Sequence, residues 1–446
     1  MKNLNDLITK YNRPGPRYTS YPPVPYWQNA PDETTWISHL KSKYDPQTGV
    51  DLYVHVPYCE SLCYYCGCSR IITKNHDVED VYLEVVLKEW ELYKKKLGFT
   101  PFINSLHFGG GTPTFLSPAN LDRLIKTLLE NKLESFIGSI EIDPRTCQTA
   151  HLKILSENGI KRVSLGIQDF DPLVQKTINR EQSPMMVEVL TEKIREHGIS
   201  SINFDLIYGL PKQTTDSIAS TIEIVIKMRP DLIAFYSYAH LPDRIKNQRL
   251  ISEKDLPSPE QKRELYELGK KLLLENGYVD VGMDHFALPS SYLYQAKIKN
   301  NLHRNFMGYV DKKSQILIGL GPTSISDSSL SFLQNIKDVK EYQNKIESGH
   351  LPIAKGHTHS DRDLLIQEII LELMCRNQAT IGDKNIPHWS VIQEELLAFK
   401  EDGIVEEIGD ELTLTETGKI FVRNVAMCFD FHLREQTSTT KFSQTI

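Results

Sequence analysis

The sequence has no long hydrophobic run and no block of like charges. Nowhere in its 446 residues does it hold the roughly 18 consecutive apolar residues of a membrane-spanning helix. Residues 1–27 contain no apolar stretch of the kind that a secretory signal needs. The formal net charge is only −7, and no five or six like charges follow one another. We therefore expect a cytoplasmic protein that binds a small molecule, without membrane insertion or a nucleic-acid partner.

Cysteine is scarce, with seven residues in the chain, and most of it lies in one stretch. The clustered cysteines are Cys59, Cys63, Cys66 and Cys68, within "YCESLCYYCGCSR". In a reducing compartment such a cluster indicates thiolates that hold a metal rather than disulfides. The remaining cysteines are isolated and are expected to be small buried hydrophobic residues: Cys147, Cys375 and Cys428.

The spacing Cys59-x3-Cys63-x2-Cys66 provides three thiolates. Three thiolates on a cubane iron–sulfur cluster leave one iron without a protein ligand, and a substrate or cosubstrate can bind there. A structural zinc site is the alternative, but it normally takes four ligands in two separated pairs. Because no second pair follows, the spacing favours an iron–sulfur cluster. Cys68 has no role in this interpretation.

Three common motifs of nucleotide binding and nucleophilic catalysis are absent: G-x-G-x-x-G, the P-loop and the nucleophile elbow. What is present is "HFGGGTPT", residues 107–114, directly after an expected strand. Three successive glycines let the backbone approach a ligand closely and point N–H groups at a carboxylate or phosphate. Such triplets also form plain tight turns, so this motif alone leaves both interpretations open.

Short runs rich in Val, Ile, Leu and Tyr alternate with amphipathic segments from residue 50 onward, which predicts parallel strands joined by helical crossovers. The expected strands are 51–56, 105–108, 139–143, 162–168, 202–209 and 232–238. We expect an α/β fold, a partial parallel (β/α)6 TIM-like barrel, with a doubly wound open sheet as the alternative. In either architecture the site lies at the carboxyl ends of the strands, where the cysteines and the glycine turn fall.

Polar residues lie at the ends of the later strands as well. They are Glu141, Gln168, Asp169, Arg180 and Asp205. Each alone is more readily explained as a satisfied polar group or a helix cap, but five on one predicted rim indicate a site. Five further polar residues show no metal-ligand spacing, and the sequence leaves open whether they serve packing or function: Asp284, His285, His303, Arg304 and Asn305.

Composition and periodicity divide the chain into three parts. Residues 1–49 hold seven prolines and little periodicity, so we expect an N-terminal arm over the active site. Residues 50–345 form the expected catalytic domain, and residues 346–446 a smaller, mainly helical C-terminal domain. The order of its elements resembles a winged helix, but its hairpin is acidic, which favours a structural or lid role over nucleic-acid binding. No coiled-coil pattern stands out, and a monomer is expected.

Taken in order, these motifs resemble the radical S-adenosylmethionine superfamily, whose signature is C-x3-C-x2-C with an aromatic residue before the last cysteine, here Tyr65. More narrowly, the chain resembles the oxygen-independent coproporphyrinogen III oxidases (dehydrogenases) of haem biosynthesis. This resemblance covers essentially the whole length, through "RPGPRYTSYP", "HFGGGTPT", "SLGIQDF", "NFDLIYGLP" and "RNVAMCFDFHLR".

The resemblance implies a 4Fe–4S cluster and two molecules of S-adenosylmethionine, with no catalytic residues beyond these cofactors. The cluster would be held by Cys59, Cys63 and Cys66, and not by Cys68. The first S-adenosylmethionine would bind the open iron and be surrounded by Tyr53, Gly110, Glu141 and Ile325. Positions matching the second are Tyr65, Gly111, Thr112, Gln168, Arg180, Asp205 and Ala239. Tyr65 stands where phenylalanine is common.

The implied reaction is the anaerobic oxidative decarboxylation of two propionate side chains of coproporphyrinogen III to vinyl groups, which gives protoporphyrinogen IX. A 5'-deoxyadenosyl radical made from S-adenosylmethionine would take hydrogen from the β carbon of the propionate. An electron donor, flavodoxin-like or ferredoxin-like, and an electron acceptor are implied but not identified. Since the substrate carries four carboxylates, we expect cations near the mouth of the site, and Arg17 and Arg304 are the candidates.

Two other functions compete with this one. Haem chaperones of the same superfamily resemble the chain in the three-cysteine core, but they lack the "RYTSYP" arm and the cysteine two residues after the core. This chain has both features, Cys68 being that cysteine. A zinc-stabilised binding protein without chemistry is the alternative from another class.

Overall fold

The computed structural model describes residues 3–382, 386–435 and 442–445. Its largest element is a 12-stranded sheet with six parallel strands at the centre. These are β1 (Val50–Val56), β4 (Ile103–Gly110), β5 (Lys132–Ile142), β6 (Ile160–Gln168), β7 (Ser201–Tyr208) and β8 (Leu232–Ser237). All six coincide with strands predicted from the sequence.

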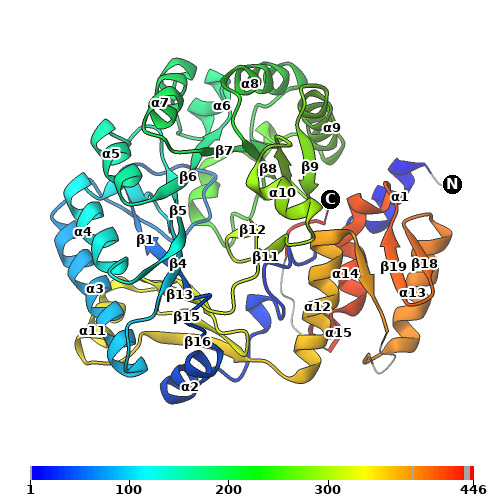
Figure 1. Cartoon of the computed structure of the whole chain (residues 1–446). Helices are drawn as coiled ribbons and strands as arrows, with labels where there is room; N and C mark the ends of the chain where they lie inside the picture. Colours follow the sequence, from blue (N-terminus) through cyan, green and yellow to red (C-terminus); the bar gives the residue numbers. More distant parts are fainter. Residues whose placement is uncertain (1–2, 383–385, 436–441, 446) are drawn as a thin grey trace.

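Helices connect these strands and lie around the outside of the curved sheet (Figure 1). They are α3 (Val78–Leu97), α4 (Pro118–Leu128), α5 (Thr149–Glu157), α6 (Pro172–Thr177), α7 (Pro184–Glu196), α8 (Thr215–Met228) and α9 (Pro259–Glu275). With all helices on one side, the sheet is a partial (β/α)6 barrel, as predicted, and not the doubly wound alternative. β1 and β8 do not pair with each other, so the barrel is open between them.

The starts of several helices follow from a short sequence pattern, a serine or aspartate followed by proline. The Ser117 hydroxyl accepts from the Asn120 N–H before α4, and Ser183 and Ser258 cap α7 and α9 in the same way. Proline fits the first helical turn because its missing N–H has no partner there, while the capping oxygen satisfies a free donor. These local signals fix where each crossover helix begins.

Further strands extend the sheet at both edges, and all of them except β13 pair antiparallel. β13 (Leu317–Leu320) pairs in parallel with β1, and β14 (Ile325–Asp327), β15 (Ser331–Asn335) and β16 (Ile353–Thr358) follow it. At the other edge β10 (His285–Ala287) and β9 (Val279–Gly282) pair beyond β8. Because β16 belongs to the large sheet, the sheet continues past residue 345, where the sequence placed the boundary of the catalytic domain.

A segment after β10 crosses the open side of the barrel (Figure 1). It contains α10 (Tyr292–Ile298), β11 (His303–Asn305) and β12 (Gly308–Val310). Arg162 at the start of β6 anchors it, with two nitrogens 3.2 and 2.7 Å from the Asp311 carboxylate. The Arg162 guanidinium also lies 3.5 Å from the centre of the Tyr292 ring. This segment thereby forms one wall of the barrel interior.

The C-terminal part has its own hydrophobic core. Its elements are α12 (Asp361–Arg376), β17 (Gln378–Thr380), α13 (Trp389–Glu401), β18 (Val405–Ile408), β19 (Glu411–Leu414), α14 (Val422–Phe429) and α15 (Phe431–Glu435). The hairpin of β18 and β19 and the following helices agree with the sequence-based expectation, and β17 completes a three-stranded sheet. Among the described residues no helix combines the length and the apolar character that crossing a membrane requires.

The N-terminal arm is ordered and joins the two cores. α1 (Leu4–Tyr11) packs on the C-terminal core, whereas α2 (Glu33–Lys43) packs against α3. The buried Arg423 guanidinium donates to the Pro16 and Gln444 carbonyls, at 2.9 and 2.8 Å, and also to the Gly15 carbonyl. One buried side chain therefore holds the arm against the C-terminal segment, residues 442–445.

A buried glutamate ties α3 to the sheet extension and to α11 (Val339–Glu347). Glu89 is fully buried and accepts hydrogen bonds from the Gly321 N–H, the Asn335 amide and the Tyr342 hydroxyl, at 2.8, 2.7 and 2.5 Å. Burial raises the pKa of Glu89 to about 7, against these hydrogen bonds, which lower it.

This raised pKa predicts a pH dependence of stability. Between the ordinary glutamate pKa and about 7, folded Glu89 binds more protons than unfolded Glu89, so the free energy of unfolding falls as the pH rises. Glu89→Gln cannot titrate. We expect the melting temperature of the wild type to fall relative to that of Glu89→Gln between pH 5 and pH 7, measured by calorimetry. Parallel curves for the two proteins would contradict the assignment.

Candidate active site

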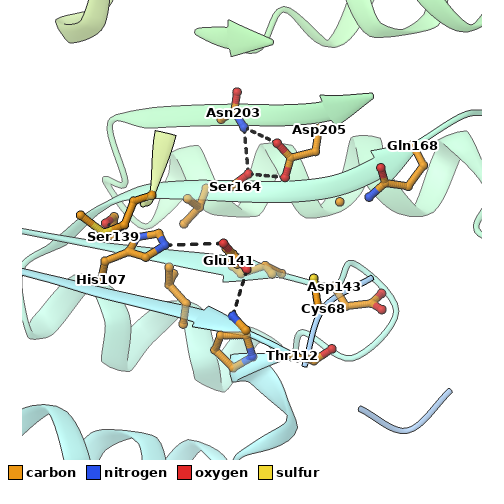
Figure 2. Close-up of a pocket in the computed structure, with 18 of the residues that line it drawn as sticks. Cys68, His107, Thr112, Ser139, Glu141, Asp143, Ser164, Gln168, Asn203 and Asp205 are labelled. Atoms are coloured by element: carbon orange, nitrogen blue, oxygen red, sulfur yellow. Dashed lines mark hydrogen bonds and ion pairs between the residues drawn. The ribbon is translucent and has the colours of Figure 1, made fainter. Parts of the chain in front are cut away.

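A cavity of about 420 Å³ opens at the carboxyl ends of the central strands (Figure 2). Most of the residues predicted from the sequence line it: Cys59, Cys63, Tyr65, Cys66, Gly110, Gly111, Thr112, Glu141, Gln168, Arg180 and Asp205. They come from the loop after β1 and from the ends of β4 to β7, as parallel strands around a partial barrel require. Cys68 lies on the same wall.

Other predicted residues lie outside this wall. Tyr53 stands directly behind it, stacked on His107 with 5.8 Å between ring centres. Ile325 lies on β14, paired with Gln334. Ala239 follows β8 and accepts a hydrogen bond from Gln248 through its carbonyl, at 3.1 Å.

The two predicted substrate arginines lie together beside the cavity. Arg17 of the arm is 3.3 Å from the Asp284 carboxylate. Arg304 of β11 donates from Nε to the Arg17 carbonyl, at 3.3 Å, and its guanidinium lies 4.7 Å from the Tyr309 ring centre. Since Tyr309 lines the cavity, Arg304 is separated from it by one side chain.

The cysteine loop is held by a short helical segment that the sequence analysis missed, η3 (Lys246–Leu250). Nδ2 of Asn247 lies 3.2, 2.8 and 3.0 Å from the carbonyls of Cys63, Tyr64 and Cys66. Gln248 donates to the Tyr65 carbonyl at 2.9 Å. These two amides fix the loop backbone, and nothing in their local sequence distinguishes them from ordinary surface amides.

Donors are aimed at two of the sulfur atoms. The Thr112 hydroxyl lies 3.3 Å from Sγ of Cys59, and nitrogens of Arg145 and Arg180 lie 3.7 and 3.5 Å from Sγ of Cys63. Such donors can face a metal-binding thiolate, because each has an N–H or O–H to offer to the sulfur. This donor set fits an iron–sulfur cluster held by Cys59, Cys63 and Cys66.

A single zinc ion does not fit the same cysteines. Sulfur ligands at 2.3 Å from a tetrahedral zinc lie about 3.8 Å from one another. Within the described ranges, the three metal-binding atoms that come within 4.8 Å of each other belong to His357, Asp363 and His432, and not to the cysteines. That other group is a hydrogen-bonded network, since the Asp363 carboxylate also accepts from the Ser360 N–H and hydroxyl.

The thiols differ in their readiness to ionise. Burial raises the pKa of Cys59 to about 11. Hydrogen bonding to Cys68 lowers the pKa of Cys66 to about 6; burial opposes this shift, and the charge of Arg70 adds to it. Metal binding at Cys59 would therefore release a proton at neutral pH, and Cys66 ionises more readily than Cys59.

Two carboxylates on the rim differ in charge. Although burial opposes ionisation, Arg180 and Arg145 lower the pKa of Asp143 to about 2. Burial raises the pKa of Asp205 to about 6, although Ser164 and Asn203 donate to its carboxylate at 2.7 and 2.9 Å (Figure 2). The rim thus offers a permanent anion near the cysteines and a carboxylate farther away that titrates close to neutral pH.

The glycine triplet is explained by crowding within the protein. Gly110 has a φ of +110°, and a side chain there would lie 2.7 Å from the His55 ring. At Gly111 the added carbon would lie 2.7 Å from the Tyr58 carbonyl oxygen. Glycine therefore lets the end of β4 pass close to the start of the cysteine loop, and Gly110 donates its N–H to Glu141 at 3.3 Å.

The three-cysteine loop at the mouth of a partial barrel is the arrangement of a radical S-adenosylmethionine enzyme, and residues 53–225 match the Radical SAM superfamily. Over the whole chain, the oxygen-independent coproporphyrinogen III oxidases of Pseudomonas aeruginosa and Escherichia coli K12 are 38% and 36% identical, each covering 99% of this chain and 98% of the relative. A solved structure, the coproporphyrinogen III oxidase (HemN) from Escherichia coli, described as a radical SAM enzyme, aligns with a TM-score of 0.87 and 34% identity over 93% of this chain and 97% of that one.

The chain belongs to the family of oxygen-independent coproporphyrinogen III oxidases. The resemblance drawn from its motifs is thereby confirmed, and a 4Fe–4S cluster and S-adenosylmethionine are its cofactors. The number of S-adenosylmethionine molecules and the individual binding residues stay predictions.

The site predicts unequal roles for two neighbouring cysteines. Cys63→Ser should lose the cluster, because it removes one of three ligands, whereas Cys68→Ser should keep it. Iron and sulfide content and the visible absorption of anaerobically purified protein measure this. Equal loss of iron from both variants would contradict the assignment of the three ligands.

Proposed function

We propose that the chain converts coproporphyrinogen III to protoporphyrinogen IX without oxygen, by oxidative decarboxylation of two propionate side chains to vinyl groups. The observation that carries this proposal is the convergence of the cysteine loop, the glycine turn and the polar strand ends on one cavity. Relatives with this name match over 99% of the chain, which supports the choice of substrate.

The protein's part in this reaction is to hold the cofactors and shield them. Cys59, Cys63 and Cys66 would hold the cluster, which supplies the electron that cleaves S-adenosylmethionine and starts the radical chemistry. Asn247 and Gln248 clamp the loop that carries these cysteines, so a cluster held by the three sulfurs would border the cavity that they line. Keeping water out of the cavity protects reactive intermediates.

Two groups of residues are proposed for two S-adenosylmethionine molecules. The first group would surround the S-adenosylmethionine bound at the open iron: Tyr53, Gly110, Glu141 and Ile325. The second group comes from the cysteine loop and from the ends of β4, β6, β7 and β8: Tyr65, Gly111, Thr112, Gln168, Arg180, Asp205 and Ala239. The polar ends of β6 and β7, where Asp205 accepts from Ser164 and Asn203, support a second ligand beyond the cluster (Figure 2).

We propose that Arg304 and Arg17 bind carboxylates of the substrate. Arg304 is only 6% exposed, and its Nη1 is buried without a hydrogen-bond partner. An unpaired buried donor costs free energy, which a carboxylate would recover. Arg17 brings the arm to the same place, consistent with an arm that lies over the site.

Further partners and conditions belong to the proposal. The reaction needs a one-electron donor, flavodoxin-like or ferredoxin-like, and an electron acceptor. The protein is proposed to act as a monomer in the cytoplasm.

An anaerobic assay tests the reaction directly. With reductant, S-adenosylmethionine and coproporphyrinogen III, we expect protoporphyrinogen IX and 5'-deoxyadenosine, separated by chromatography. Release of 5'-deoxyadenosine without any decarboxylated porphyrinogen would contradict the substrate while leaving the superfamily chemistry intact.

The role of Arg304 predicts a specific kinetic defect. Arg304→Gln removes a charged donor, and loss of about 1.5–3 kcal/mol of binding corresponds to a roughly 10- to 160-fold increase in KM for coproporphyrinogen III. Iron content should stay at the wild-type level. The matched control is Arg376→Gln, an exposed arginine paired with Glu372 at 2.9 Å, which should leave KM unchanged. An unchanged KM in Arg304→Gln would contradict a role in substrate binding.

A further inference from the structure

Arg145 lies on the cavity wall but has no part in the proposed binding sites. It follows β5 in the stretch "EIDPR" and directs Nη2 at Sγ of Cys63, at 3.7 Å. Its position is fixed by Asp143, because Nε, Nη2 and the Arg145 backbone N–H all donate to that carboxylate, at 3.0, 2.7 and 3.0 Å. The guanidinium is therefore held against the sulfur and does not swing freely in solvent.

The charges around Cys63 do not cancel without the sulfur. Arg145 and Arg180 both contact Asp143, with Arg180 at 3.1 Å, and the lowered pKa of Asp143 keeps it ionised. One carboxylate faces two guanidinium groups, which leaves one positive charge in a group whose side chains are 22%, 7% and 9% exposed for Arg145, Arg180 and Asp143. Both arginines contact the sulfur of Cys63, which carries negative charge when it ligates a metal.

The two arginines are attached differently to the fold. Arg180 also donates to the Gly166 carbonyl from Nε and Nη2, at 3.1 and 2.6 Å, so it holds the end of β6 as well. Arg145 has contacts in this group with Asp143 and Cys63 alone. Arg145 is therefore the member whose charge can be changed with the least effect on the barrel.

We infer that Arg145 is a positioning residue that raises the reduction potential of the cluster held by Cys63. Reduction adds one negative charge to the cluster and its thiolates, and a fixed positive charge with an N–H···S contact stabilises the reduced state. The negative charge of Asp143 lowers this potential, so Arg145 and Asp143 together set the reduction potential of the cluster. This inference rests on the proposed function, because it requires that the three cysteines hold the cluster.

The test is a redox titration of the anaerobically reconstituted full-length protein, followed by electron paramagnetic resonance. We expect the midpoint potential of Arg145→Gln to shift to more negative values, and that of Arg145→Lys, which keeps the charge, to shift less. Asp143→Asn removes the opposing charge and should shift the potential to more positive values. A merely structural role would not move these variants in opposite directions.

Arg162→Gln is the matched control. Arg162 also lines the cavity and pairs with a carboxylate, Asp311, at 2.7 Å. It lies four residues before Gly166 on β6, about 13 Å along the strand. Gly166 is the residue whose carbonyl Arg180 contacts beside Cys63. The charge of Arg162 is therefore farther from the cysteine, and its loss should leave the midpoint potential unchanged.

The outcomes separate the inference from the proposed function. Equal midpoint potentials in cluster-loaded wild type and Arg145→Gln would overturn the inference alone, as would shifts of the same sign in Arg145→Gln and Asp143→Asn. If Arg145→Gln does not retain its cluster, the positive shift of Asp143→Asn decides, and its absence overturns the inference. A wild-type protein that holds no cluster after reconstitution would contradict the proposed function as well.

Discussion

The site depends on the placement of metal-binding sulfur atoms in a cavity that is partly withdrawn from water. A thiolate there is costly unless positive charge or donors face it. Arg145, Arg180 and Thr112 provide them, while Asp143 holds both arginines in place. The charges and donors that would stabilise thiolates here would also surround the iron–sulfur cluster. Stability of the site and control of its redox chemistry therefore have one physical origin.

The rest of the architecture brings distant parts of the chain to this place. The parallel strands deliver the ends of β4 to β7 to one rim, and the segment of α10, β11 and β12 covers the open side of the barrel. The arm then crosses to β11, where Arg304 donates to the Arg17 carbonyl. Arg423 fixes the arm at its other contact, on the C-terminal part. A large anionic substrate would thus meet residues from the barrel, the crossing segment and the arm.

Local patterns in the sequence were sufficient for much of this arrangement. Alternating strands and helices determine a parallel sheet, and Ser-Pro pairs mark helix starts, because both signals act over a few residues. The cysteine spacing and the resemblance identified the chemistry. Contacts between residues that are distant in sequence have no such local signal. Asn247 supports the cysteine loop from a segment about 180 residues away in sequence, and the pairing of β16 with the large sheet depends on a partner strand that only the fold supplies. Arg145 contacts Cys63, 82 residues away in sequence, and only the fold brings the end of β5 beside the cysteine loop.

The central claim is that three cysteines hold a cluster with one iron open to S-adenosylmethionine. Electron–nuclear double resonance of the reduced protein, with S-adenosylmethionine labelled with 15N at its amino group, measures this contact directly. A hyperfine coupling from the labelled nitrogen is the predicted result. A cluster-loaded protein that binds labelled S-adenosylmethionine without any such coupling would contradict the account.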